Sequence, residues 1–355
     1  MIRAAVRAQG AYHFANIPCR VKLDQNESPY EPPAAVKAQA LKLIAEAPVN
    51  RYPELLADSL RAALGRYHGW PIEGVVVSNG SNVLIQAMVA AAGLGQQVLA
   101  VTPTFPIYGI QARLLGAELI EVPLEQGFAL PTAALTAHLA RGSGAFFLAN
   151  PAAPTGNLYA PEELQALLEA AGERWLVVID EAYGQFAGSD ALALIRQAPL
   201  AVSLRTFSKA FGLAGVRLGY ALAQPEVARE LQKALLPFSI SLVQVAFGLA
   251  ALEAPEYLAP RLAEVRLERE RLRGGLEALG LTVFPSATNF LLFKVADAAV
   301  FYRGLVERGV LIRRQDHLPG LIGCLRVSVG APDENGAFLE AAAEVVRSSY
   351  ATSPH

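Results

Sequence analysis

Cysteine is scarce in this sequence, and so are patterns that could hold a metal ion. The 355 residues contain two cysteines, Cys19 and Cys324, near opposite ends of the chain. These counts argue against a disulfide framework and fit a reducing cytosol. The five histidines are scattered and show no metal-ligand spacing: His13, His68, His138, His317 and His355. We therefore expect no metal site.

Apolar segments long enough to span a membrane are also missing. Residues 1–7 lack the continuous apolar core of a signal peptide, and the apolar run 83–94 is too short and contains Gln86. The net charge of −2 gives no electrostatic basis for binding nucleic acid or an anionic membrane. We expect a soluble cytoplasmic protein with neither of these partners.

Apolar strands alternate with helical patterns through the first two thirds of the chain. This alternation predicts an α/β fold with a largely parallel sheet covered by helices on both faces. The expected strands are residues 75–77, 97–101, 118–122, 145–149, 175–179 and 200–204. The expected helices include residues 34–45, 83–92 and 161–171. A further helix is expected to carry Leu55, Leu56, Leu60 and Leu64 on one face.

The pattern changes to helices from about residue 234, and a smaller α/β unit follows the long amphipathic segment 257–279. A chain of this length suits two domains. We place an N-terminal arm and a segment packing on the smaller domain at 1–45. The large domain is expected at 46–250 and the smaller C-terminal domain at 251–350.

A small polar turn follows the strand at 75–77. Ser81 and Asn82 would open the next helix, and free main-chain N–H groups at a helix N-terminus favour an anion. A simple N-cap explains these residues equally well.

Two charged residues follow neighbouring strands. Asp180 closes the strand 175–179, and a carboxylate there needs a partner or a ligand. Lys209 lies in the glycine-containing stretch 205–220, after the strand 200–204, and a lysine flanked by small and apolar residues can serve as a nucleophile of lowered pKa. A surface loop lysine is the alternative. Because ligands bind at the carboxyl ends of strands in open α/β sheets, both residues should face one crevice.

A set of short motifs occurs in one order along nearly the whole chain. They are NESPY (26–30), RYP (51–53), NGSN (79–82), PTF (103–105), PTG (154–156), DEAY (180–183), RTFSKAFGLAGVRLGY (205–220), TNF (288–290) and LRVSVG (325–330). In these motifs the chain resembles the fold-type I, pyridoxal-phosphate-dependent aminotransferases of class I/II, and within them it is similar to the histidinol-phosphate aminotransferases. The stretch 205–220 is the most specific part of the resemblance.

The resemblance implies roles around the ring of pyridoxal phosphate. Lys209 would bind the cofactor covalently and then move a proton between the substrate and the cofactor. Asp180 would pair with the pyridinium nitrogen. Tyr183 would reach the phenolic oxygen, and Phe105 would stack on the ring.

The resemblance also implies how the cofactor phosphate is held. Tyr52 would reach the phosphate of a partner subunit, which makes a homodimer part of the function. Within the subunit, the implied cofactor-binding donors near the phosphate are Ser81, Asn82, Thr206, Ser208 and Arg217.

For the substrate, Arg326 matches the residue that binds an α-carboxylate. Arg313 and Tyr30 match positions that meet the distal phosphate of histidinol phosphate, and Asn26 belongs to the same implied set. Since histidinol phosphate has no α-carboxylate, the two arginines would share its phosphate, and the carboxylate would belong to the co-substrate glutamate.

The chain departs from the family pattern at three positions. Ala153 replaces an asparagine that bonds the phenolic oxygen, Val83 replaces an acidic residue, and Phe105 replaces a tyrosine. We expect Tyr183 to carry more of the lost contact, together with Asn150. Without such a substitute the loss is roughly 1 to 3 kcal/mol.

Two other readings of the motifs stay open. One is a close relative with another reaction, either an aromatic aminotransferase or a threonine-phosphate decarboxylase. The other is a cofactor-binding protein without catalysis, which Ala153 alone suggests.

Overall fold

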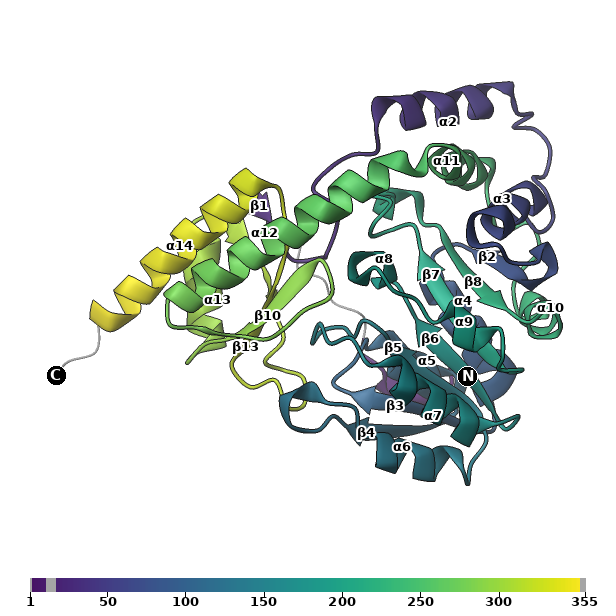
Figure 1. The fold of residues 1–355 in the computed structure, drawn as a ribbon, viewed down its shortest axis with the longest axis horizontal. Helices are drawn as coiled ribbons and strands as arrows, with labels where there is room; N and C mark the ends of the chain where they lie inside the picture. The colour runs from purple at the N-terminus through teal and green to yellow at the C-terminus, as the bar shows by residue number, and fades with distance from the viewer. Residues whose placement is uncertain (1, 11–16, 352–355) are drawn as a thin grey trace.

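A seven-stranded sheet is the largest element of the computed structural model, which describes residues 2–10 and 17–351 (Figure 1). Its strand order is β2-β8-β7-β6-β5-β3-β4. β8 is antiparallel to both of its neighbours, and the other pairs in this sheet are parallel. The strands are β2 (Val75–Ser78), β3 (Gln97–Thr102), β4 (Glu118–Pro123), β5 (Gly144–Ala149), β6 (Trp175–Asp180), β7 (Ala201–Thr206) and β8 (Gly219–Ala223).

Both faces of this sheet are apolar, and each belongs to a separate hydrophobic core. Along β5, Phe146 and Leu148 join the first core, while Ala145 and Phe147 join the second. Successive side chains of a strand point to opposite faces, so a strand buried on both sides must be apolar throughout. This explains the continuous apolar runs that predicted the strands.

Helices cover both faces of the sheet, which confirms the predicted α/β class (Figure 1). The first core includes residues of α2 (Ala34–Glu46), α3 (Asp58–His68), α6 (Thr132–Leu139), α7 (Pro161–Ala171), α9 (Leu192–Ile195) and α11 (Leu242–Glu253). The second includes residues of α4 (Ser81–Met88), α5 (Ile107–Leu115) and α10 (Pro225–Lys233). The short α1 (Ala4–Ala8) contacts α5, and a π-helical turn, Val89–Gly93, continues α4.

A smaller unit lies beside the large sheet and is drawn in green to yellow in Figure 1. It contains an antiparallel sheet of order β12-β13-β10-β9. Its strands are β9 (Thr282–Val283), β10 (Phe290–Lys294), β12 (Arg313–Arg314) and β13 (Cys324–Ser328). The helices α12 (Leu258–Ala278), α13 (Ala298–Glu307) and α14 (Pro332–Ala351) contribute to its hydrophobic core.

The N-terminal segment divides its contacts between the two units. β1 (Val21–Lys22) pairs in parallel with β11 (Val310–Leu311) of the smaller unit. In contrast, α2 packs against α11, and Val36 and Ala40 belong to the first core of the large sheet. Residues 11–16 of the predicted arm lie outside the described residues. The domain boundaries near residues 45 and 250 remain predictions, and residue 250 falls within α11.

Two local features differ from the sequence expectation. The helix expected to include Leu55 begins only at Asp58, because Ala57 has a φ of +54° and interrupts the helical backbone. Leu55 lies before it and is 52% exposed, whereas Leu60 and Leu64 are buried as expected. Strand β8 was not expected, because its Gly and Ala residues have low strand propensity.

No single helix within residues 2–10 and 17–351 is long and apolar enough to cross a membrane. α11 and the following segment 255–278 are together long and apolar enough to span a membrane, but they are bent by 72° relative to each other.

Candidate active site

The carboxyl ends of β6 and β7 place the two candidate catalytic charges at one edge of the large sheet. Asp180 is the last residue of β6, and Lys209 follows the end of β7 at Thr206. The two strands are parallel neighbours with Asp180 opposite Leu204. The expected convergence at the sheet edge follows from this parallel pairing.

Asp180 is a buried carboxylate with a donor on each oxygen. Tyr108 donates to Oδ2 at 2.6 Å, and the main-chain N–H of Ala182 donates to Oδ1 at 3.0 Å. Burial raises the pKa of Asp180 to about 6, while these two hydrogen bonds oppose the rise. Near neutral pH the group is therefore an anion that can pair with a buried cation.

The side-chain amine of Lys209 has a lowered pKa. Its Nζ donates to the main-chain oxygen of Gln25 at 2.8 Å and lies 5.9 Å from the centre of the Tyr183 ring. Burial lowers the pKa of Lys209 to about 7, and the positive charges of Arg326 and Arg217 contribute. A substantial neutral fraction at pH 7 is what a nucleophilic lysine needs.

Tyr183 is oriented by Asn26, which was expected to bind substrate. Asn26 Nδ2 donates to the Tyr183 hydroxyl oxygen at 2.8 Å, and Asn26 Oδ1 accepts from Ser328 at 3.1 Å. Asn289 in turn donates to the main-chain oxygen of Asn26 at 3.1 Å. Because the Tyr183 oxygen already accepts from Asn26, its own proton is available for another acceptor.

The turn before α4 forms a cradle suited to an anion. The first helical residues are Ser81 and Asn82, whose main-chain N–H groups have no acceptor within a helix. Gly219 of β8 lies so close that a Cβ there would be 2.3 Å from the Ser81 nitrogen. Arg217 donates to Ser208 Oγ at 3.3 Å, and a Cβ on Gly80 would be 2.6 Å from the Arg217 guanidinium.

Thr206 supports this cradle from the end of β7. Its side-chain oxygen accepts from the main-chain N–H of Ser208 at 3.0 Å. The hydrogen bond fixes the turn between β7 and Lys209, so Thr206 shapes the cradle through the backbone of its neighbours.

Arg313 and Arg326 form a cross-strand pair of cations. They are opposite residues of the antiparallel strands β12 and β13, so their side chains lie on the same face of the smaller sheet. Arg326 also donates to the main-chain oxygen of Asp24 at 2.9 Å, and its guanidinium lies 5.3 Å from the centre of the Phe290 ring. Adjacent like charges repel each other, which favours an anion between or beside them.

Two of the expected site residues have other contacts in the structure. Asn150 accepts from the main-chain N–H of Tyr159 at 2.8 Å, and its Nδ2 donates to the main-chain oxygen of Tyr159 at 3.5 Å, so its side chain holds this loop. Its contact with the phenolic oxygen stays a prediction. Tyr30 lines a small cavity with Lys209, but its hydroxyl donates to Glu264 at 2.5 Å. This hydrogen bond, with burial, raises the pKa of Tyr30 to about 12.

The remaining two aromatic candidates lie in different settings. Phe105 packs edge-on against Tyr108, with ring centres 5.6 Å apart, next to Asp180. Tyr52 is 83% exposed and its ring lies 4.9 Å from that of Phe238, within the surface of the large unit.

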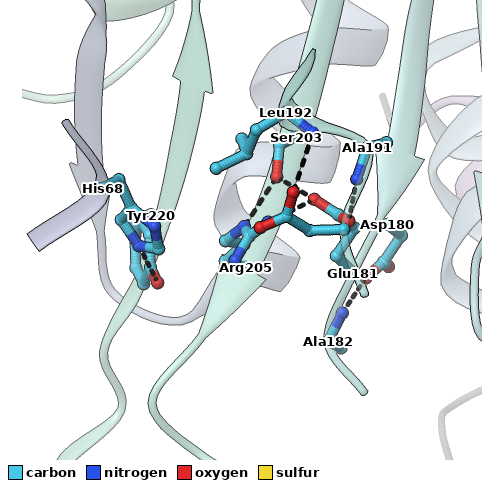
Figure 2. Close-up of polar contacts among 10 residues, drawn as sticks. His68, Asp180, Glu181, Ala182, Ala191, Leu192, Ser203, Arg205 and Tyr220 are labelled. Atoms are coloured by element: carbon cyan, nitrogen blue, oxygen red, sulfur yellow. Dashed lines mark hydrogen bonds and ion pairs between the residues drawn. The ribbon is translucent and has the colours of Figure 1, made fainter. Parts of the chain in front are cut away.

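A buried ion pair lies beside Asp180, because one of its members, Glu181, is the next residue of the chain (Figure 2). Arg205 of β7 donates to Glu181 Oε2 at 2.7 Å, and Ser203 donates to the same oxygen. Glu181 Oε1 accepts from the main-chain N–H of Ala191 at 2.8 Å. Burial alone would lower the pKa of Arg205, but the charge of Glu181 outweighs burial and the net shift is upward. Both carboxylate oxygens of Glu181 therefore accept hydrogen bonds, and these hold the side chain in place.

Next to this pair, His68 and Tyr220 share a hydrogen bond of 2.9 Å (Figure 2). Burial and the charge of Arg205 lower the pKa of His68 to about 3. The histidine is therefore neutral near pH 7 and adds no positive charge beside Arg205.

Tyr108 and the Glu181–Arg205 pair were missed by the sequence reasoning. Tyr108 lies three residues after Phe105, and its position after the end of β3 is the signal that could have pointed to the site. The sequence did indicate that a carboxylate at the end of β6 needs a partner or a ligand. The partners of Asp180 and Glu181 became known only with the strand pairing. In the described part of the chain, no cluster of three or more metal-ligating side chains occurs.

The fold and this site together define a fold-type I aminotransferase. Residues 20–342 match the family model of aminotransferase class I and II, and the chain belongs to this family, which uses pyridoxal phosphate. It is 48% identical over 343 residues to a histidinol-phosphate aminotransferase of Deinococcus radiodurans, covering 96% of this chain and 95% of the relative. It is 41% identical to the enzyme of that name from Thermococcus kodakarensis, covering 97% and 98%.

A solved structure of the same kind has a closely similar fold. The histidinol-phosphate aminotransferase of Sinorhizobium meliloti, in complex with pyridoxal-5′-phosphate, aligns with a TM-score of 0.87 and 27% sequence identity. The alignment covers 98% of each chain. The predicted resemblance is thereby confirmed at the level of the family and the fold.

Replacing Glu181 with alanine should destabilise the protein strongly, because Arg205 would be left buried without its main counter-charge. We expect the free energy of unfolding to fall by about 3 to 5 kcal/mol. Urea unfolding followed by circular dichroism measures this change. The matched control is Glu230→Ala, which breaks an exposed ion pair with Lys233 and should leave the unfolding midpoint unchanged. Equal midpoints for the two variants would contradict a structural role for the buried pair.

Proposed function

We propose that this enzyme transfers an amino group between glutamate and imidazole acetol phosphate, forming 2-oxoglutarate and histidinol phosphate in histidine biosynthesis. The observation that carries the proposal is the cross-strand arginine pair, in which Arg313 lies opposite Arg326. The charge of Arg326 acts on Lys209, and two cations suit a phosphate dianion. The names of the relatives at 41% and 48% identity support the same substrate.

The residues present fit pyridoxal phosphate. The cradle formed by Ser81, Ser208 and Arg217 suits the phosphate, because it combines a helix N-terminus with a hydroxyl and a guanidinium. The buried anion of Asp180 suits a protonated ring nitrogen. When bound, the cofactor supplies an electron sink that stabilises negative charge on the substrate Cα.

Three side chains would carry the chemistry around that cofactor. Lys209, with a pKa near 7, both attaches the cofactor and carries the proton that leaves and returns to the substrate. Asp180 keeps the ring nitrogen charged. Tyr183, whose oxygen accepts from Asn26, directs its own proton to the phenolic oxygen. This assigns to Tyr183 the contact that Ala153 cannot make.

The arginine pair would bind two anions alternately. Arg326, held at the main-chain oxygen of Asp24, would bind the α-carboxylate of glutamate. Arg313 joins it when the phosphate of the imidazole substrate occupies the site. One cationic site thus serves both halves of the reaction, since the two substrates never need to bind together.

A homodimer is part of the proposal. Exposed apolar residues gather where Tyr52 lies against Phe238, and a cavity of about 220 Å³ nearby is lined by Leu55 and Leu236. Tyr52 is 83% exposed and Leu236 80% exposed, and a cluster of exposed apolar side chains of this kind marks a protein–protein interaction site. A second copy would cover them and bring Tyr52 to the cofactor phosphate of its partner. Since Cys19 and Cys324 are free thiols, we place the dimer in the cytoplasm.

Lys209→Ala should abolish turnover while the fold persists, because the variant lacks the amine that binds the cofactor. The wild-type protein should show a visible absorption band, and borohydride should fix the cofactor to the peptide containing Lys209, as detected by mass spectrometry. The rate of cofactor capture should rise with pH with a midpoint near 7, because the neutral amine is the reactive form. The control Lys233→Ala alters an exposed lysine and should behave as wild type. Normal turnover of Lys209→Ala would refute the assignment.

Arg313→Ala should lower kcat/KM for histidinol phosphate by about 10- to 100-fold, the worth of a lost charge-assisted hydrogen bond. Phenylalanine, which has no phosphate, should lose much less. A coupled assay with histidinol phosphate, phenylalanine and threonine phosphate measures the three side by side. Equal losses for the first two would favour an aromatic aminotransferase, and release of carbon dioxide from threonine phosphate would favour the decarboxylase.

Leu236→Arg should shift the protein from dimer to monomer, because it buries a charge at the proposed subunit contact. Sedimentation velocity measures the mass directly. Ile322→Arg is the matched control, since Ile322 is also 80% exposed but lies in the smaller unit. A wild-type protein that is monomeric and fully active would contradict the need for the partner's Tyr52.

A further inference from the structure

Tyr108 is a buried tyrosine whose ring orientation is fixed by packing. It lies in the first turn of α5 and is 0% exposed. Its ring stacks on Phe147 of β5 with centres 5.0 Å apart and planes 13° apart, and it packs edge-on against Phe105. Aromatic contacts on two sides fix the ring plane, and therefore the direction of the hydroxyl.

The Tyr108 hydroxyl points at the carboxylate that ends β6. It donates to Asp180 Oδ2 at 2.6 Å, a distance typical of a strong hydrogen bond to an ionised oxygen. The other oxygen of Asp180 accepts from the main-chain N–H of Ala182 at 3.0 Å. A carboxylate has about four acceptor positions, so both oxygens keep room for one more donor.

We propose that Tyr108 is a positioning residue that keeps Asp180 ionised and aims it at the ring nitrogen of the cofactor. This inference rests on the proposed function, in which Asp180 pairs with that nitrogen. A hydrogen bond donated to a carboxylate favours its charged form. Without Tyr108 the buried carboxyl group holds its proton at higher pH, and a neutral acid stabilises a protonated ring nitrogen poorly.

A purely structural role for Tyr108 makes a different prediction. Tyr108→Phe keeps the ring and its stacking on Phe147, and it removes only the oxygen that bonds Asp180. If packing were the whole role, this variant would bind cofactor as wild type does. If the hydroxyl acts through Asp180, the variant should lose affinity for a cofactor that has a ring nitrogen and keep its affinity for an analogue that has none.

The chain offers a matched control for this substitution. Tyr159 is also buried, at 5% exposure, and its hydroxyl has no hydrogen-bond partner among the residues that the structure describes. Tyr159→Phe therefore removes a buried hydroxyl of the same kind without removing a contact to Asp180. Comparing the two variants separates the effect of the hydrogen bond from that of a missing oxygen.

The test measures the dissociation constant of pyridoxal phosphate and of its 1-deaza analogue, which has carbon in place of the ring nitrogen. Fluorescence titration of the cofactor-free wild type, Tyr108→Phe and Tyr159→Phe is carried out at pH 6 and pH 8. We expect Tyr108→Phe to bind pyridoxal phosphate about 10- to 100-fold more weakly. The loss should be greater at pH 6, where Asp180 takes up its proton more readily.

The deaza analogue decides between the interpretations. Tyr108→Phe and wild type should bind it equally, since no ring nitrogen is present to pair with Asp180, and Tyr159→Phe should match wild type with both ligands. An equal loss of both ligands by Tyr108→Phe, or no loss of either, would overturn the proposal. A wild-type protein that does not bind pyridoxal phosphate would refute the proposed function itself, and this inference with it.

Discussion

The ion pair between Glu181 and Arg205 is the contact on which the geometry of the site depends. It joins the ends of β6 and β7, the strands that carry Asp180 and lead to Lys209. Removing two charges from water costs more than their attraction returns unless other donors satisfy them, and here Ser203 and a main-chain N–H do so. This satisfied buried pair links the two strands that carry the proposed catalytic groups, Asp180 and Lys209.

The site is closed by a segment from the beginning of the chain. The main-chain oxygens of Asp24 and Gln25 accept from Arg326 and Lys209, and Asn26 bonds Tyr183. This segment therefore links the cations of the smaller unit to the catalytic groups of the large sheet. Burial lowers the pKa of Lys209, and the charge of Arg326 lowers it further. Under the proposed function, an anionic substrate bound at Arg326 would offset that charge and so raise the basicity of the amine.

Sequence patterns could predict strands β2 to β7 and the candidate residues at their carboxyl ends, because continuous apolar runs and short motifs are local signals, but they did not predict β8. Contacts that depend on tertiary structure could not be predicted. The partner of Glu181 follows from the pairing of β6 with β7, and Tyr108 meets Asp180 only after β3, α5 and β6 come together. Asn150 accepts a hydrogen bond from Tyr159 across a loop. The prolines of this loop predict a turn but not which residues the turn brings together.

The central claim is that one site takes an amino group from glutamate and gives it to a phosphorylated imidazole ketone. Stopped-flow absorbance of the holoenzyme tests it most directly. Glutamate alone should bleach the visible band and release one 2-oxoglutarate per site, and imidazole acetol phosphate should then restore the band while forming histidinol phosphate. A band that glutamate leaves unchanged, or that an aromatic keto acid restores and imidazole acetol phosphate does not, would contradict the account.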